Sequence, residues 1–115
     1  MKLLTKALQK QIPPLYSTED VPLGDKMVVA KFFDPCGSYT LYIIELSEEE
    51  DDTLLWGLTT GLYEDEFGYT SLNEISAYKG KLGLGIERDL HWAPTKIKDI
   101  RGIKRSVWDF RCEED

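Results

Sequence analysis

The stretch GLGIERDLHWAP, residues 83–94, holds the only histidine of the chain, His91, beside two carboxylates and an arginine. If residues 86–93 form a β-strand, alternation places Glu87, Asp89 and His91 on one face. Two carboxylates and an imidazole at this spacing could bind a divalent metal ion or transfer protons. The same pattern is typical of the water-facing side of an antiparallel strand. Because no second histidine is present to complete a site, we favour the water-facing interpretation and expect no catalytic residue, metal or cofactor.

Arg88 lies in the same stretch, where the alternation calls for an apolar residue. A buried guanidinium needs a carboxylate or several carbonyl oxygens as partners. We favour a structural ion pair with an acid of a neighbouring strand. The second interpretation is an anion anchor in a small-ligand pocket walled by tryptophans. The candidate pocket residues are Arg88, Trp92, Trp56, Glu87, Asp89 and His91.

The charge of the chain is unevenly distributed. The chain has 14 basic and 21 acidic residues and a net charge of −7, yet residues 32–78 contain eleven acids and no Lys or Arg. An acidic protein repels phosphate, so direct nucleic-acid binding is disfavoured, whereas a basic protein would be attracted. The candidate partner-binding acids are Glu48, Glu49, Glu50, Asp51, Asp52, Glu64, Asp65 and Glu66.

Length and composition indicate one soluble domain. The chain has 115 residues, of which 42% are hydrophobic and 30% charged. No run approaches the roughly 18 apolar residues of a membrane helix, and the first residues lack the features of a signal peptide. We therefore expect a cytoplasmic protein without membrane contact, spanning residues 1–115 with a core over about 3–100 and a C-terminal extension over 101–115. The sequence leaves the oligomeric state open.

Two strands and a tight turn form the clearest structural signal. β-branched and aromatic residues fill residues 27–33 and 38–46, and Asp34-Pro-Cys-Gly37 between them suits a type I turn. A third strand is expected from Thr53, with Gly57 as a possible bulge. The stretch LYEDEFGY is expected to be a connection or a short strand that ends over residues 67–70, and a further strand is expected over residues 86–93.

Helix signals are found at three places. Thr5 can cap a helix that continues to Gln11, and Ser71 can cap a helix that Gly80 ends. A third helix is expected after Pro94, with Ile97, Ile100 and Ile103 as its apolar face. We therefore predict an α+β fold with an antiparallel sheet of four to five strands and two to three short helices on one face.

Three stretches, LLTKALQKQIPPLYSTEDVPL, VVAKFFDPCGSYTLYIIE and GLGIERDLHWAP, resemble a small bacterial family known as domain of unknown function 2958. The resemblance extends from about Leu3 to about Ile100 and implies no activity, cofactor or catalytic residue. It also implies a place on mobile genetic elements, where a small acidic protein can occupy the basic groove of a host defence nuclease. We therefore expect a non-enzymatic binding protein that engages a basic host protein. The alternative is a protein that binds or sequesters a nucleotide or another small anion.

Overall fold

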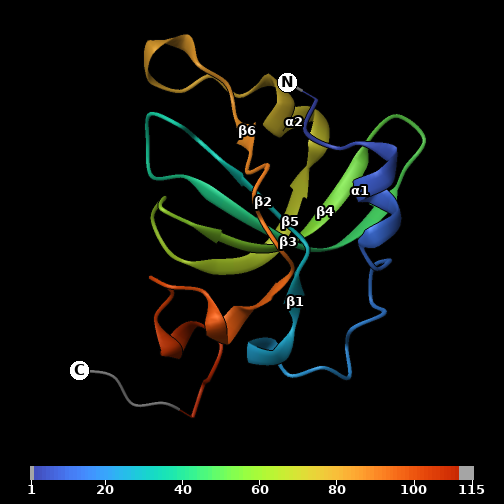
Figure 1. Ribbon diagram of the computed structural model, residues 1–115, viewed down its shortest axis with the longest axis vertical. Coiled ribbons are helices and arrows are strands. Elements are labelled where there is room, and N and C mark those ends of the chain that lie inside the picture. The colour runs from blue at the N-terminus through green and yellow to red at the C-terminus, as the bar shows by residue number, and fades with distance from the viewer. Residues whose placement is uncertain (1, 112–115) are drawn as a thin grey trace.

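The computed structural model describes residues 2–111, which are arranged around a five-stranded antiparallel sheet of order β5-β4-β3-β2-β6 (Figure 1). A second, two-stranded sheet pairs β1 with β7. The predicted α+β class is confirmed. The strands are β1 (Met27–Val28), β2 (Ala30–Phe33), β3 (Thr40–Glu48), β4 (Thr53–Thr60), β5 (Glu66–Ser71), β6 (Glu87–Arg88) and β7 (Thr95–Lys96). The helices are α1 (Lys6–Gln11), α2 (Leu72–Ala77) and the 3₁₀ helices Leu23–Asp25, Lys81–Gly83, Ile97–Asp99 and Arg105–Val107.

The predicted hairpin is formed by β2 and β3. The Asp34 carboxylate accepts a hydrogen bond from the Cys36 amide at 2.9 Å, and the Gly37 amide donates to the Asp34 carbonyl at 3.3 Å. An aspartate that caps its own turn and a glycine at the fourth position favour this connection. Asp34 is buried, and its carboxylate also accepts from the Tyr78 hydroxyl at 2.9 Å, which raises the pKa of Tyr78.

A β-bulge interrupts the pairing of β3 with β4. Ile43 lies opposite Gly57, but Glu45 lies opposite Trp56, so Ile44 is the extra residue. A bulge is therefore present beside Gly57, but its extra residue lies on β3 and not on β4, the strand that contains Gly57. It turns Glu45 toward the same face of the sheet as Trp56, because directly opposed residues share a face.

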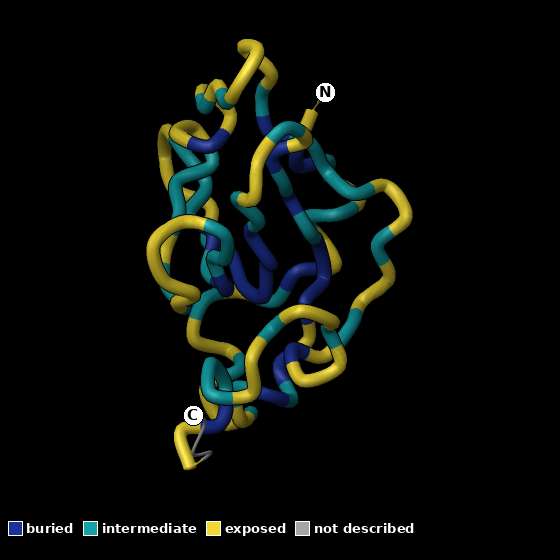
Figure 2. The backbone as a smooth tube through the Cα atoms, turned by 90° about the vertical axis from the view of Figure 1, so that its left-hand side faces the viewer, coloured by how far each residue is buried: buried dark blue, intermediate teal, exposed yellow. Residues whose placement is uncertain are grey.

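Apolar side chains cover both faces of the sheet. Along β3, Leu41 and Ile43 belong to one buried cluster, and Tyr42 and Ile44 belong to the other. Both α-helices pack into the first cluster, which confirms the prediction for these two helices, whereas the segment of the third predicted helix packs on the other face. The second cluster is covered by the chain that follows β7, around the fully buried Ile97. The buried backbone (dark blue) runs through the middle of the molecule, inside the exposed loops (Figure 2).

Both predicted helix caps are present. The Thr5 hydroxyl accepts from the Leu8 amide at 3.1 Å, and the Ser71 hydroxyl accepts from the Glu74 amide at 3.2 Å. These bonds satisfy amides that no helical carbonyl can reach. The second helix ends at Ala77, before the predicted Gly80, because the C-cap residue Tyr78 has a non-helical ψ of 136°.

The strand predicted over residues 86–93 is much shorter than expected. The structure has only the two residues of β6, after which the chain turns at Asp89. The Asp89 carboxylate accepts from the His91 amide at 2.9 Å, and its carbonyl accepts from the Trp92 amide at 3.3 Å. An aspartate that bonds the backbone two residues ahead stabilises a turn in competition with a strand.

The prediction of an α-helix after Pro94 is wrong. Residues 95–96 form β7, and two 3₁₀ helices follow instead of one α-helix. The spacing of Ile97, Ile100 and Ile103 fits three residues per turn as well as it fits an α-helix. Gly102, with a φ of +88°, prevents one continuous helix. All three isoleucines nevertheless pack into the second cluster.

The predicted C-terminal extension packs on the body as far as the structure describes it. The Trp108 ring lies against Gly24 so closely that a Cβ there would be 2.5 Å from Trp108 Cε3. A 2.8 Å salt bridge from Lys98, in the 3₁₀ helix Ile97–Asp99, reaches Asp25 next to this contact. The segment therefore forms part of the core layer on this face of the sheet.

Candidate functional site

Arg88 holds the beginning of the described chain. Its Nη1 donates to the carbonyl oxygens of Leu3 at 3.0 Å and Lys2 at 3.3 Å. Carbonyl oxygens are suitable partners for a half-buried guanidinium. This geometry agrees with a structural role, and it places Arg88 between β6 and the segment that leads into α1.

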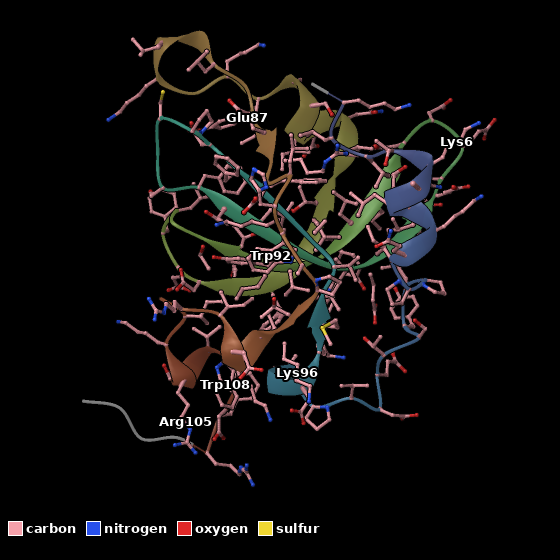
Figure 3. All side chains as sticks on the ribbon, viewed as in Figure 1. Lys6, Glu87, Trp92, Lys96, Arg105 and Trp108 are labelled. Carbon is pink, nitrogen blue, oxygen red and sulfur yellow. The ribbon has the colours of Figure 1, made fainter. Side chains whose placement is uncertain are left out.

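The predicted ligand pocket is assembled only in part. A cavity of about 270 Å³ is lined by Arg88, Asp89 and Trp92 together with residues of α1. Trp56 lies elsewhere, where it stacks on Phe67 with ring centroids 5.6 Å apart. Glu87 and His91 are absent from the lining. Figure 3 shows Glu87 on the strand above Trp92. The Nε1 of Trp92 donates to the Val28 carbonyl at 3.0 Å.

No three His, Cys, Asp or Glu side chains within residues 2–111 gather closely enough to hold a metal ion. No helix in the described part of the chain has the length and apolar character needed to cross a membrane.

The predicted partner-binding acids form two clusters. We call Glu48–Asp51, at the turn between β3 and β4, the hairpin cluster, and Glu64–Glu66, between β4 and β5, the loop cluster. Strand β4 separates them by its length of eight residues, or about 26 Å at 3.3 Å per residue. All seven side chains are exposed, and within residues 2–111 none forms a salt bridge with a Lys or Arg.

Asp52, the eighth predicted acid, has a structural role. Its Oδ1 accepts from the Thr53 amide at 2.7 Å and the Asn73 amide at 2.9 Å, and its Oδ2 accepts from the Ser71 hydroxyl. The bond from Ser71, followed by that from the Asn73 amide, lowers the pKa of Asp52. Asp52 therefore joins the hairpin turn to the beginning of α2 and contributes to the fold.

We expect an Asp52→Asn variant to be less stable than the wild type at neutral pH, with the difference vanishing in acid. The pKa of Asp52 is lowered in the folded state, so its stabilisation is present above the ordinary value of 3.8 and is lost as the pH falls through the folded-state pKa. Urea unfolding of both proteins over a pH series measures this. Glu50→Gln, in the same turn and without such bonds, is the control. A difference independent of pH would contradict the assignment.

A buried polar network is the main feature that the sequence analysis missed. Glu45 is only 4% exposed, and its carboxylate accepts from the amides of Tyr16 at 2.9 Å and Thr18 at 3.0 Å, as well as from the Thr18 hydroxyl. Lys26, 6% exposed, donates to the carbonyl and hydroxyl of the same threonine, and its Nζ lies 5.5 Å from the Trp56 ring centroid. The network fastens residues 13–25 to the sheet. The position of Glu45 inside the apolar run YIIEL is the signal that could have indicated it.

A groove of about 900 Å³ lies between α1 and the β3–β4 end of the sheet. Lys6 and Lys10 lie on its helix side, and Glu48 and Glu49 lie on its hairpin side. Figure 3 shows Lys6 at this outer side of α1. Because both signs of charge line the groove, it does not by itself select a charged ligand.

The family described as Protein of unknown function (DUF2958) matches residues 3–99. The chain belongs to this family. The resemblance identified from the sequence is thereby confirmed over all seven strands and both α-helices. No curated protein and no solved structure shows a significant match. Both acidic clusters and the Glu45 network lie within the part that matches the DUF2958 family, whereas Trp108 lies beyond it.

Proposed function

We propose that the chain is a non-enzymatic binding protein that engages a basic protein through its two acidic clusters. The observation that carries the proposal is the set of seven exposed carboxylates without a cationic partner in the described chain. Uncompensated surface charge of one sign attracts a partner of the opposite sign and accelerates its association. Electrostatic complementarity is therefore the main source of selectivity.

The class of partner that fits is a nucleic-acid-binding protein. Such proteins carry Lys and Arg where phosphates bind, and carboxylates can occupy those positions. The net charge of −7 argues against binding nucleic acid directly. On a mobile genetic element, the context implied by the family resemblance, a host defence nuclease in the cytoplasm would be such a partner, and the chain would act against that defence.

Sequestration of a small anion is the second candidate, and the cavity beside Arg88 favours it. Its volume of about 270 Å³ lies just below the range of roughly 300–1,000 Å³ that ligand pockets occupy. The Arg88 guanidinium, which would hold the anion in this candidate function, also donates to two backbone carbonyls. A thermal-shift screen with nucleotides and anionic metabolites tests this candidate, since a specific ligand raises the unfolding temperature.

The acid-cluster proposal is tested by removing four charges from the clusters and, in a control of equal net charge, four charges from elsewhere. One variant combines the substitutions Glu49→Gln, Glu50→Gln, Glu64→Gln and Glu66→Gln. The matched control removes the same number of charges outside the clusters, by Glu19→Gln, Asp20→Asn, Glu87→Gln and Asp99→Asn. Asp52 stays unchanged in both, because it stabilises the fold.

We expect wild type and control to bind a basic nuclease recovered from host lysate and to displace its nucleic acid. The cluster variant should bind at least about tenfold more weakly, a loss of about 1.4 kcal/mol. Binding should also weaken from low to moderate salt. Isothermal titration calorimetry and displacement of labelled DNA measure both quantities. Equal affinity of the two variants, or a nuclease that keeps its nucleic acid throughout, would overturn the proposal.

A further inference from the structure

Strand β5 is an open edge of the sheet. It is the last strand of the order β5-β4-β3-β2-β6, and within residues 2–111 no other strand pairs with its outer side. Proteins commonly protect such an edge with Lys, Pro or a covering helix. β5 has the sequence EFGYTS, without Lys or Pro. Its outer hydrogen-bonding groups are therefore available to an additional strand.

Hydrogen bonds of β3 show which of its backbone amide and carbonyl groups point toward β4 and which point away from it. The Leu46 amide donates to the Pro13 carbonyl, and the Leu46 carbonyl accepts from the Leu15 amide, both at 3.0 Å. The polar groups of Leu46 thus point away from β4. Those of its neighbour Glu45 point toward β4, since successive residues alternate, and they meet Trp56. The polar groups of Trp56 accordingly face β3.

The same alternation continues across the sheet. Next to Trp56, Gly57 faces β5 and pairs with Gly68. The residues on either side of Gly68 therefore point outward. Phe67 and Tyr69 each present an amide and a carbonyl group to the open side, which is the pattern that an added antiparallel strand requires.

Carboxylates lie at both ends of this edge. The loop cluster leads directly into β5 and includes its first residue, Glu66. At the other end, the side-chain amide of Asn73 donates to the Asp51 carbonyl at 2.7 Å, which brings the hairpin cluster next to the end of β5. The six residues of β5 span about 20 Å. The two clusters, although on separate turns, thus flank one strand edge.

Exposed apolar side chains accompany the edge. Leu62 is 58% exposed and Tyr63 is fully exposed, both just before the loop cluster, and Tyr69 on β5 is 51% exposed. Exposed tyrosines are enriched at protein interfaces, because they bury a large area at a small cost in side-chain entropy.

We propose that β5 pairs with an extended basic segment of the partner, which adds a sixth strand to the sheet and carries Lys or Arg at both ends of the pairing stretch. This inference rests on the proposed function and names its recognition mode. The backbone groups of Phe67 and Tyr69 provide the pairing, and the acidic clusters select a strand with cationic ends.

A second copy of the chain fits this edge poorly. Antiparallel pairing of two β5 strands would place the loop cluster of each copy beside the hairpin cluster of the other. Like charges brought together in this way oppose association. The charge of the edge therefore favours a basic partner over a homodimer.

The test uses a synthetic peptide of alternating Val and Thr with Lys-Arg at both ends. Its control has the same sequence with every backbone amide of the Val-Thr stretch methylated, so that the charge is equal but neither edge of the peptide strand can donate to β5. We expect the methylated peptide to bind at least tenfold more weakly. Binding of the unmodified peptide should protect the amides of Phe67 and Tyr69 from hydrogen exchange.

Two variants of the chain separate backbone pairing from side-chain contact. Tyr69→Pro removes the outward amide and the ring, whereas Tyr69→Thr removes only the ring. The outward amide does not serve the pairing with β4, so both variants should fold, which circular dichroism and thermal unfolding verify. We expect the proline variant to bind the peptide at least tenfold more weakly than the threonine variant.

The outcomes separate this inference from the proposed function. Equal binding of methylated and unmodified peptides, or no binding of either, overturns strand addition at β5 and leaves the nuclease experiment to decide the proposed function. If removing the acidic clusters changes neither nuclease nor peptide binding, the proposed function fails, and methylation-sensitive binding would then show strand pairing without charge selection.

Discussion

A Gly57→Ala variant should lose about 3 kcal/mol of unfolding free energy, at the upper end of the usual cost of overpacking. A Cβ at this position would lie 1.8 Å from the Tyr42 carbonyl oxygen and 3.2 Å from Ile43 Cα. These are backbone atoms of the neighbouring strand at the bulge, so they cannot move aside without separating β3 from β4. Chemical denaturation monitored by circular dichroism measures the loss.

Gly68 provides a matched control, because it is the direct partner of Gly57 on β5 and a Cβ there meets no atom within 4 Å. Gly68→Ala should leave stability unchanged or raise it by up to about 1 kcal/mol, since alanine restricts the unfolded chain. Similar stabilities for the two variants would contradict the close approach of the strands at Gly57.

A Glu45→Ala variant should also lose about 3 kcal/mol, because it leaves two amide donors and a hydroxyl of a partly buried segment without their acceptor. The amides of Tyr16 and Thr18 both donate to this carboxylate. Residues 13–25 should then separate from the sheet, which hydrogen exchange of those two amides would reveal alongside urea unfolding.

Glu48→Ala, on the same strand but exposed, is the control and should change stability by less than about 0.5 kcal/mol. Lys26→Met tests the network from the other side, because the ammonium donates to Thr18 while its stem packs by the Trp56 ring. The Glu45→Ala and Lys26→Met effects should not be additive, since both act through Thr18. Strict additivity would show that the two charges act independently.

Local chemistry made part of this fold predictable. The hairpin turn at Asp34 and the helix caps at Thr5 and Ser71 rest on bonds between residues two or three positions apart. Such bonds depend on residue type and spacing alone, and all three predictions are confirmed. The isoleucines after Pro94 were correctly predicted to form an apolar face, but they were assigned to the wrong helix type, because a three-residue spacing does not distinguish the two. They also pack on the face of the sheet opposite the two α-helices.

Long-range pairing made the rest inaccessible from the sequence. Thr18 and Glu45 are 27 positions apart, and nothing near either residue indicates the other. The two acidic clusters are similar in composition to solvated loops, and only the strand order shows that they flank one edge. Asp52 has the same residue type as its exposed neighbour Asp51, yet its bonds to a distant helix give it a structural role.

The meander from β2 to β5 has a consequence for how the chain folds. In the first hairpin, Phe33 pairs with Thr40, seven positions away, whereas β6 joins the sheet by pairing Glu87 with the same Phe33, 54 positions away. Closing the longer loop costs about 2 kcal/mol more in chain entropy. The four strands β2 to β5 can therefore nucleate from neighbouring contacts, and β6, with the N-terminal segment that Arg88 holds, is expected to dock on a sheet that is already formed.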